Sequence, residues 1–400
     1  MVNSSYFKMI NIKRSLYTII AISFLFQIIK FYSFFEEYSD WQYVDWIINY
    51  QGGFVRRGLI GEFLFRLYEL TKINLDILIL VFVSLIILFN SYFLLRSTKY
   101  AYNSYINTLI FLSPGFFLYS IMNSEIIGRK DILMIFVMGF FVFFEKNINS
   151  RKLFLLLSSS IIVLCLSHSA FLFYTPYILF LYFLIKINRK EKIKIFEIVF
   201  FISLLFLILF LILFNQGTEF QVKEICSSVK NFVSEKCKFH GQIKWLQNDL
   251  NAYLYEKTTT GINYFQSLFV YLSSFVLVYF FLGLKIYKSK FKTNYYSFDK
   301  INPLIVFILL FSLTLPSYIL ALDWGRYIFI SYSSSFFIFI YCLKNNLIST
   351  TFDIKLNNTV FLLIIILYSF FWTFPFYNAT NFKLVLEKPI ISILKHLEKK

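Results

Sequence analysis

The chain contains a succession of apolar runs close to 20 residues long, and this feature limits its fold more than any other. A helix of about 20 apolar residues crosses the roughly 30 Å hydrocarbon core of a bilayer. Of the 400 residues, 58% are hydrophobic and 15% are charged, whereas soluble proteins carry about 25% charged residues. The sequence therefore predicts a polytopic, all-α membrane protein. It excludes a soluble enzyme, a nucleic-acid-binding protein and a secreted disulfide scaffold.

Eleven apolar segments have the composition expected of membrane spans, although the fourth and fifth are short. We therefore expect a transmembrane helical bundle of about 11 spans (10–12), forming a single integral-membrane domain over residues 1–400. The first segment follows Lys8, Lys13 and Arg14 and has no small-residue cleavage site, which favours a retained anchor over a signal peptide. The expected spans are 15–35, 74–95, 104–121, 132–145, 153–167, 169–186, 195–214, 262–284, 302–320, 327–343 and 358–375.

The 39 Lys and Arg residues predict how the chain is oriented. They outnumber the 22 Asp and Glu residues and concentrate in the short connectors between alternate spans, which is how membrane proteins fix their topology. This pattern predicts a multi-pass protein of the bacterial inner membrane with a cytoplasmic N-terminus. The lysines after residue 376 do not fit: either a span is miscounted or the tail lies on a surface as an amphipathic helix.

With this orientation, every unusual polar segment lies on the outer, periplasmic side. Two of these segments are long: a first periplasmic loop over 36–73 and a large periplasmic loop over 215–261. The others are short connectors at 122–131, 167–169 and 322–326. The inner connectors are basic and otherwise plain. The sequence thus predicts that the active or binding face is extracytoplasmic.

The first periplasmic loop opens with an acidic segment, EEYSDWQYVDW at 36–46. A carboxylate at a membrane surface can act as a general base or bind a cation, and Asp40 is the candidate catalytic residue here. The alternative interpretation is a solvated loop in which Trp41 and Trp46 anchor the chain at the interface.

Directly after it comes GGFVRRGLIGE at 52–62, the start of an expected amphipathic helix from Val55 to Leu70. Arg56 and Arg57 at such a helix start suit a phosphate or pyrophosphate, because arginine offers a planar bidentate fork and the helix adds amide donors. The alternative is a pair of arginines that snorkel to lipid headgroups.

The three short connectors add further candidates. Glu125 and Arg129 lie between the third and fourth spans, His168 forms the joint between the fifth and sixth, and Asp323 and Arg326 lie between the ninth and tenth. Ionisable groups at membrane depth tend to be functional. The alternatives are a self-paired turn, a histidine that caps a helix end, and an Asp–Arg pair that binds only itself.

Cysteine spacing and missing motifs limit the remaining chemistry. Cys226 and Cys237 are separated by ten residues in the large periplasmic loop and could form a disulfide in an oxidising compartment. The chain has no CxxC pair, HExxH, P-loop, GxGxxG or GxSxG. We therefore expect no cofactor and assign no metal ligands; a divalent metal has no clean motif to support it.

The segments GGFVRRGLIGE at 52–62 and DWGRY at 323–327, together with ten or more spans and one larger outer loop, resemble bacterial oligosaccharide-repeat polymerases of the O-antigen and capsule type. More broadly, the chain resembles membrane glycosyltransferases of the GT-C class, which carry an acidic residue in the first outer loop. It departs from that class in having no clean DxD or ExD pair.

The resemblance implies that the chain polymerises oligosaccharide repeat units linked to undecaprenyl diphosphate. It implies a lipid-linked oligosaccharide substrate, contacts with membrane lipids, and a chain-length regulator and a flippase as partners. A hydroxyl of one glycan would attack the anomeric carbon of another, with lipid pyrophosphate as the leaving group. In this interpretation Asp40, His168 or Glu125 is catalytic, and Arg56, Arg57, Arg129, Arg326 and Asp323 bind the pyrophosphate.

Other functions stay open at this point. A GT-C enzyme could instead add a single sugar from a polyprenyl-phosphate donor. A transporter or flippase would want polar residues within several spans, where we find chiefly Lys30, Asn90 and Glu197. It would also favour broken helices at matching positions in two halves, which we do not expect from the sequence. An integral acyltransferase would depend on His168 alone.

Overall fold

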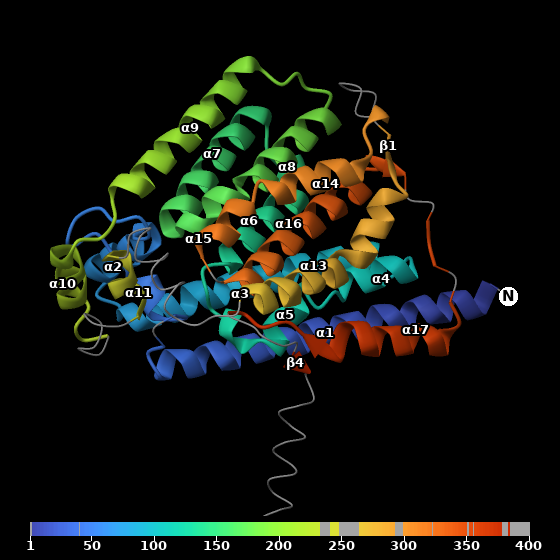
Figure 1. Cartoon of the computed structure of the whole chain (residues 1–400), viewed down its shortest axis with the longest axis horizontal. Coiled ribbons are helices and arrows are strands. Elements are labelled where there is room, and N and C mark those ends of the chain that lie inside the picture. Colours follow the sequence, from blue (N-terminus) through green and yellow to red (C-terminus); the bar gives the residue numbers. More distant parts are fainter. Residues whose placement is uncertain are drawn as a thin grey trace, which may run out of the picture.

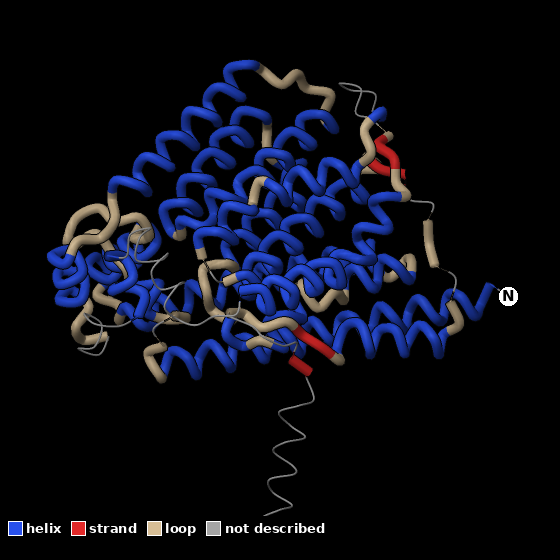
Figure 2. Tube along the Cα trace, in the orientation of Figure 1, coloured by secondary structure: helices blue, strands red, loops and turns tan. Residues whose placement is uncertain are grey.

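The computed structural model describes residues 2–39, 41–232, 241–247, 264–292, 299–321, 323–349, 352–354, 356–377 and 383–384, and their fold is almost entirely helical. Figure 2 shows helices throughout, with two very small sheets. Each sheet is an antiparallel pair: β1 (Lys290–Phe291) with β2 (Ile348–Ser349), and β3 (Trp372–Thr373) with β4 (Lys383–Leu384). The predicted all-α class is confirmed.

Eight helices among the described residues are long and apolar enough to cross a membrane, so the chain is a multi-pass membrane protein. Most of these helices end within a few residues of the bounds that hydropathy predicts. They are Ile12–Glu36 within α1 (Val2–Glu36), α3 (Leu75–Ala101), α7 (Ser150–Ser167), Ser169–Asn188 (η4, Ser169–Tyr174, with α8, Thr175–Asn188), α9 (Ile195–Phe214), Gln266–Tyr287 within α13 (Tyr264–Tyr287), Pro303–Leu320 (α14, Pro303–Ser312, with α15, Leu315–Leu320) and α16 (Trp324–Lys344).

The other three expected spans form shorter or interrupted helices. Segment 104–121 is divided into α4 (Tyr105–Phe111) and α5 (Phe117–Met122), with Pro114 and Gly115 in the break. Segment 132–145 forms only the 13-residue α6 (Ile132–Phe144). Segment 358–375 forms α17 (Asn358–Ile365), which continues as the π-helix η8 (Ile366–Phe370).

Two of the expected spans are interrupted helices. The α4–α5 break contains Pro114, and the α14–α15 break is followed by Pro316 in the first turn of α15. Proline lacks an amide hydrogen and clashes with the preceding turn, so it interrupts the helix in both places. Inside a bilayer, such backbone is tolerated only where neighbouring protein surrounds it. Both breaks lie beside α13, since Ser113 donates to the Val278 carbonyl at 3.1 Å and the rings of Phe275 and Phe311 are 4.2 Å apart.

Helix α16 is the centre of the bundle, with 89% of its most apolar window buried. It packs on α6, and the two run in the same direction. At their first residues Arg326 binds Asp131, and at their last residues Lys344 binds Glu145 at 3.2 Å. From residue 326 to 344 the helix rises roughly 27 Å, at about 1.5 Å per residue. We name the two faces of the bundle the Arg326 end and the Lys344 end.

The Lys344 end carries a balanced ion network. Lys344 and Arg189 both approach Glu145, while Lys186 lies 3.1 Å from each of Glu191 and Glu197. Three cations therefore face three carboxylates at the ends of four helices. These ion pairs join the ends of the four helices at this face.

The Arg326 end is covered by a small helical cap. It consists of η1 (Val44–Ile47), α2 (Leu59–Thr71), α10 (Glu219–Ser228), α11 (Gly241–Lys244) and η6 (Trp245–Gln247). Figure 1 shows α2, α10 and α11 together, at the end opposite the N-terminus. The two long polar segments of the sequence thus come together in space.

The predicted amphipathic helix exists but begins later than expected, at Leu59 rather than Val55. Arg57 therefore precedes the N-cap residue Gly58 and is not in the first turn. The glycine pair before it has a packing role: a Cβ at Gly52 would lie 2.7 Å from the Gln221 backbone, and Gly53 has φ +104°.

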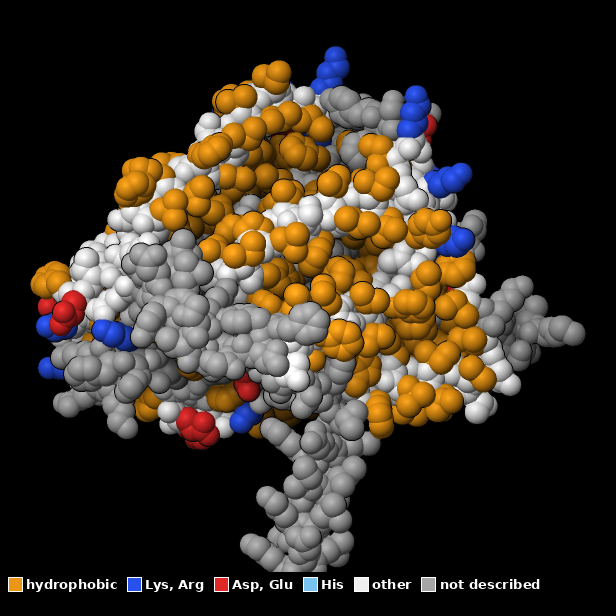
Figure 3. Space-filling model, viewed as in Figure 1, with side chains coloured by type: hydrophobic (Ala, Val, Ile, Leu, Met, Phe, Trp, Pro, Cys, Tyr) orange, Lys and Arg blue, Asp and Glu red, His pale blue; other side chains and the backbone are white. Residues whose placement is uncertain are grey.

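The lateral surface between the two ends is apolar. Figure 3 shows hydrophobic side chains over the helical body, with charged ones toward its edges. Helix α9 is the extreme case, with Phe196, Phe206 and Phe214 each more than 60% exposed. Such a surface is stable against lipid and would aggregate in water.

Candidate functional site

The centre of the Arg326 end is a buried guanidinium with every nitrogen occupied. Arg326 Nε donates to both carboxylate oxygens of Asp131 at 2.8 and 2.7 Å. Its two terminal nitrogens contact Asp323 Oδ2 at 3.3 Å and His168 Nε2 at 2.8 Å. Asp131 and Asp323 are the N-cap residues of α6 and α16 and make no side-chain cap bond. Their carboxylates are therefore free to turn toward the arginine.

His168 is committed to Arg326 in this arrangement. Its Nδ1 faces the amide of Ala170 at 3.3 Å, and its Nε2 faces Arg326 at 2.8 Å. A neutral imidazole accepts at only one nitrogen, so we assign the accepting lone pair to Nε2, which has the shorter contact. That lone pair is then unavailable to a substrate proton, and His168 positions Arg326. It also occupies the N-cap position of η4.

A second buried pair lies beside the first. Lys130 Nζ is 3.4 Å from Asp45 Oδ1 and donates to the Arg57 carbonyl at 3.1 Å. Trp46, one residue after Asp45, donates from Nε1 to the Gly128 carbonyl at 2.6 Å. The first periplasmic loop and the 122–131 connector are thus joined by both charge and hydrogen bonds.

Arg129 differs from Arg326 because no carboxylate holds it. Its Nε donates to the Glu125 carbonyl at 2.9 Å, and its guanidinium lies 4.1 Å from the Phe376 ring centre and 5.7 Å from that of Trp41. Neither terminal nitrogen of this guanidinium has a hydrogen-bond partner among the described residues. The side chain is buried all the same. A buried arginine held by aromatic rings, with its fork free, is suited to bind an anion.

The ion pairs leave a surplus of positive charge among the described residues. We call this group the Arg326 cluster; it contains Arg57, Arg129, Lys130, Arg326, Asp45, Asp131, Asp323 and His168. Three of its cations, Arg129, Lys130 and Arg326, are buried, against two of its carboxylates, Asp45 and Asp131. The half-buried Arg57 and Asp323 cancel, so an excess of one positive charge remains among these residues.

The titration behaviour of the cluster reflects that surplus. Burial lowers the pKa of His168 well below its usual 6.5, and Arg326, Arg57, Lys130 and Arg129 lower it further. Burial also lowers the pKa of Arg129, with Arg326 as the next cause. The cations are close enough to disfavour one another, which an incoming anion would relieve.

This electrostatic arrangement predicts a specific acid sensitivity. Because the folded pKa of His168 is lowered, below pH 6.5 the unfolded chain binds a proton there that the folded chain does not. Stability should then fall with falling pH by up to about 1.4 kcal/mol per unit. We expect His168→Gln to lose this slope when thermal unfolding of the detergent-solubilised protein is compared at pH 7.5 and 5.0. An unchanged slope would show that His168 is not the group responsible.

Of the remaining candidate residues predicted from the sequence, some contact the helical cap and others do not. Arg56 donates to the Trp245 carbonyl at 3.3 Å, and Arg57 donates to Gln242 at 2.7 Å, so both touch the cap. Arg57 Nε is buried without a partner among the described residues. Glu125 is exposed, and its carboxylate makes no contact with them. Asp40 lies outside the described residues.

Only one of the two cysteines of the predicted Cys226–Cys237 disulfide lies in the described residues. Cys226, on α10, is disulfide-bonded, whereas Cys237 lies outside the described residues. Cys165 and Cys342 are free, buried thiols. No group of three or more His, Cys, Asp or Glu side chains in the described part of the chain could hold a metal ion.

Sequence reasoning did not select Asp131, Lys130 and Asp45, which complete the cluster. Asp131 and Lys130 are fully buried. A signal was present: Gly-Arg occurs at 128–129, just before α6, and again at 325–326, in the first turn of α16. That repetition could have suggested that the two connectors meet.

A C-terminal strap, residues 372–377, crosses the cluster. Phe374 stacks on Tyr119 with ring centres 4.5 Å apart, and Phe376 covers Arg129. The Pro375 carbonyl approaches Gly325 so closely that a Cβ there would lie 2.0 Å away. The chain therefore returns to the Arg326 end after α17.

Gly325→Ala should displace this strap and destabilise the protein by about 1–3 kcal/mol, because a methyl group cannot share that space. Gly283→Ala is the matched control, since nothing lies within 4 Å of its added Cβ, and it should be neutral or slightly stabilising. Thermal unfolding in detergent measures both. Equal unfolding temperatures for the two variants would contradict the close approach.

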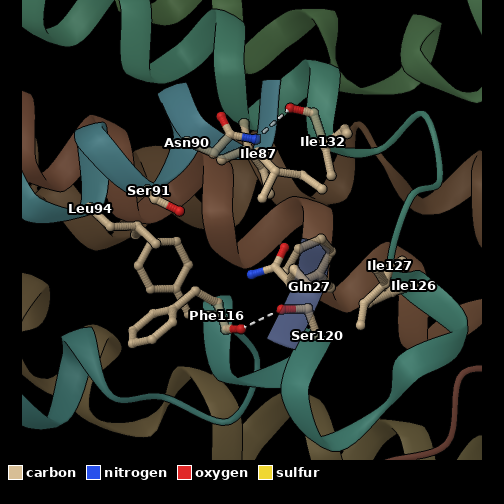
Figure 4. Close-up of a pocket in the computed structure, with 13 residues that line it drawn as sticks. Gln27, Ile87, Asn90, Ser91, Leu94, Phe116, Ser120, Ile126, Ile127 and Ile132 are labelled. Carbon is tan, nitrogen blue, oxygen red and sulfur yellow. Dashed lines mark hydrogen bonds between the residues drawn. The ribbon is translucent and has the colours of Figure 1, made fainter. Parts of the chain in front are cut away.

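A cavity beside the cluster is too small for a sugar or a lipid chain. It has a volume of about 30 Å³ and lies beneath the 122–131 connector, lined partly by Gln27, Asn90, Ser91 and Ser120. Figure 4 shows Asn90 donating to the Ile132 carbonyl, a 3.0 Å bond, and Asn90 Oδ1 has no partner among the described residues. This volume suits one or two waters.

Comparison with known protein families, with curated proteins and with solved structures gives no match for this chain.

Proposed function

We propose that the protein is a membrane glycosyltransferase that polymerises oligosaccharide repeat units carried on undecaprenyl diphosphate. The observation that carries this proposal is the surplus of buried cations around Arg129 at one face of a membrane bundle. A diphosphate attached to a lipid is an anion held at that depth, and it would neutralise the excess charge. The same proposal makes this face periplasmic, in a bacterial inner membrane.

In the proposed reaction, a hydroxyl of one glycan attacks the anomeric carbon of a second, lipid-linked glycan. The bond from that carbon to the diphosphate oxygen breaks, and the hydroxyl proton passes to a base. Arg129 and Arg57, which have nitrogens without a partner among the described residues, would stabilise the departing diphosphate. Arg326 would hold α6 and α16 in register beneath them. Glu125, whose carboxylate is exposed, is the favoured base, because His168 is occupied by Arg326.

The architecture belongs to the same proposal. If the α4–α5 pair, α6 and α17 also cross the membrane, the chain has eleven spans, and its bundle would be of the GT-C type. A chain-length regulator and a flippase would be its partners. Cysteine accessibility mapping tests this topology: residues at the Arg326 end should react with a membrane-impermeant maleimide from the periplasm, and residues at the Lys344 end should not.

Reconstitution tests the activity. Purified protein in liposomes, supplied with undecaprenyl-diphosphate-linked repeat units, should yield a ladder of products and release undecaprenyl diphosphate. A single added sugar from a polyprenyl-phosphate donor would instead identify a non-processive transferase. No product from either donor would overturn the proposal.

Transport is the second candidate, and one observation favours it. Two proline-interrupted helices flank α13, and paired interruptions of this kind mark binding sites in secondary transporters. The balanced network at the Lys344 end would then serve as a closed gate. Protein-dependent movement of a labelled lipid-linked glycan across liposomes, without any change in its length, would support this function over polymerisation.

A further inference from the structure

One tryptophan of the Arg326 end is available to a ligand. Of the five tryptophans in the chain, Trp41 is the one whose side chain is exposed, at 38%. It lies against Trp245 of the cap, with ring centres 6.3 Å apart, and beside the guanidinium of Arg129. An aromatic ring that faces both an arginine and the outside can bind a ligand that is partly apolar and partly anionic.

A single carbonyl group fixes this arrangement. The Glu125 carbonyl accepts from Gln42 Nε2 at 3.1 Å and from Arg129 Nε at 2.9 Å. Gln42 follows Trp41 directly, so the indole, the guanidinium and the Glu125 residue are held together from two segments about 85 residues apart in the sequence. The Glu125 carboxylate remains exposed and without a partner among the described residues.

These three groups match the chemistry of a sugar next to a phosphate. A pyranose ring presents a face of C–H groups, which packs on the electron-rich face of an indole. Its hydroxyls donate strongly to a carboxylate. A phosphate at its anomeric position would reach the arginine fork.

We infer that Trp41, Glu125 and Arg129 form a sugar subsite, in which the indole and the Glu125 carboxylate bind the first sugar of a glycosyl diphosphate lipid and Arg129 binds its phosphate. The inference rests on the proposed function and narrows it: recognition would extend to the glycan and not only to the lipid anion. The alternative without sugar recognition is that Trp41 anchors the loop in lipid headgroups. In that case it would contribute equally to every lipid ligand.

Binding to two lipids separates these possibilities. The full chain in nanodiscs is titrated with undecaprenyl diphosphate and with the same lipid carrying an oligosaccharide. We expect Trp41→Ala to weaken binding of the glycan-bearing lipid about tenfold more than binding of the bare lipid, and Trp41→Phe to retain most of the affinity. Phe63→Ala is the matched control. It removes an aromatic ring of α2 that is 58% exposed, and it should change the binding of neither lipid.

The outcomes are distinct. If Trp41→Ala weakens both lipids equally, or neither, the sugar subsite is wrong while phosphate recognition stands. If Phe63→Ala has the same effect as Trp41→Ala, membrane anchoring explains both. If the wild-type chain binds neither lipid, the proposed function fails and the sugar subsite fails with it.

Discussion

Replacing Asp131 by asparagine should lower the free energy of unfolding by about 3–5 kcal/mol, the largest stability loss that we expect from any single change in the Arg326 cluster. Asp131 is fully buried and is the closest counter-ion of Arg326. Asparagine keeps the shape but removes the charge, which leaves a buried guanidinium beside two other buried cations, Arg129 and Lys130. The cost of that uncompensated charge is the physical origin of the effect.

Two further variants make this result interpretable. Asp323→Asn removes the other carboxylate on Arg326, but that side chain is 24% exposed and its contact is longer, at 3.3 Å, so water should limit the loss to about 1 kcal/mol. The double change Asp131→Leu with Arg326→Leu removes both charges and should recover much of the stability. Chemical unfolding in detergent measures all three. A double variant as unstable as Asp131→Asn would show that packing, and not charge, dominates at this position.

Arg129 should show the opposite behaviour, with a large functional loss and a small effect on stability. Arg129→Lys keeps the charge but loses the bidentate fork, and we expect product formation to fall by about 100-fold, the scale set by removal of one preorganised donor. Since no described carboxylate depends on Arg129, the unfolding temperature should change little.

Arg66→Lys is the control for this experiment. Arg66 is also an arginine of the Arg326 end, but it is exposed and pairs with Glu62 and Glu69 on α2. It should retain full activity. If Arg129→Lys and Arg66→Lys are equally active, Arg129 does not bind the diphosphate, and the cationic surplus is then structural.

Much of the fold follows from hydropathy alone. Segment 195–214 coincides with α9, and 327–343 lies within α16, because a bilayer requires an uninterrupted apolar helix of about that length. The breaks were less visible, since apolar composition continues through Pro114 and Pro316. Those prolines are the local signal that hydropathy ignores. Segment 132–145 was also read as a full span, although its helix has 13 residues.

The site was less predictable, because the local sequence does not determine which distant residues pair in the folded chain. Arg129, Arg326 and His168 could each be selected as ionisable groups at membrane depth. Their different roles could not, since these depend on Asp131, which lies 195 residues from Arg326. From the sequence, all the arginines are equivalent candidates. In the structure, every nitrogen of the Arg326 guanidinium has a partner, whereas the terminal nitrogens of Arg129 have none among the described residues. Gly52, which precedes the arginines expected to bind phosphate, lies against the backbone of α10.

The most direct test of the central claim is deletion of the gene in its native host, followed by gel analysis of the surface glycans. The account predicts loss of the long ladder, with a core plus one repeat unit remaining, and restoration by the wild-type chain but not by Arg129→Lys. A band shortened by one sugar would identify a single-sugar transferase. An unchanged ladder would contradict the glycan function altogether and would leave transport as the stronger interpretation.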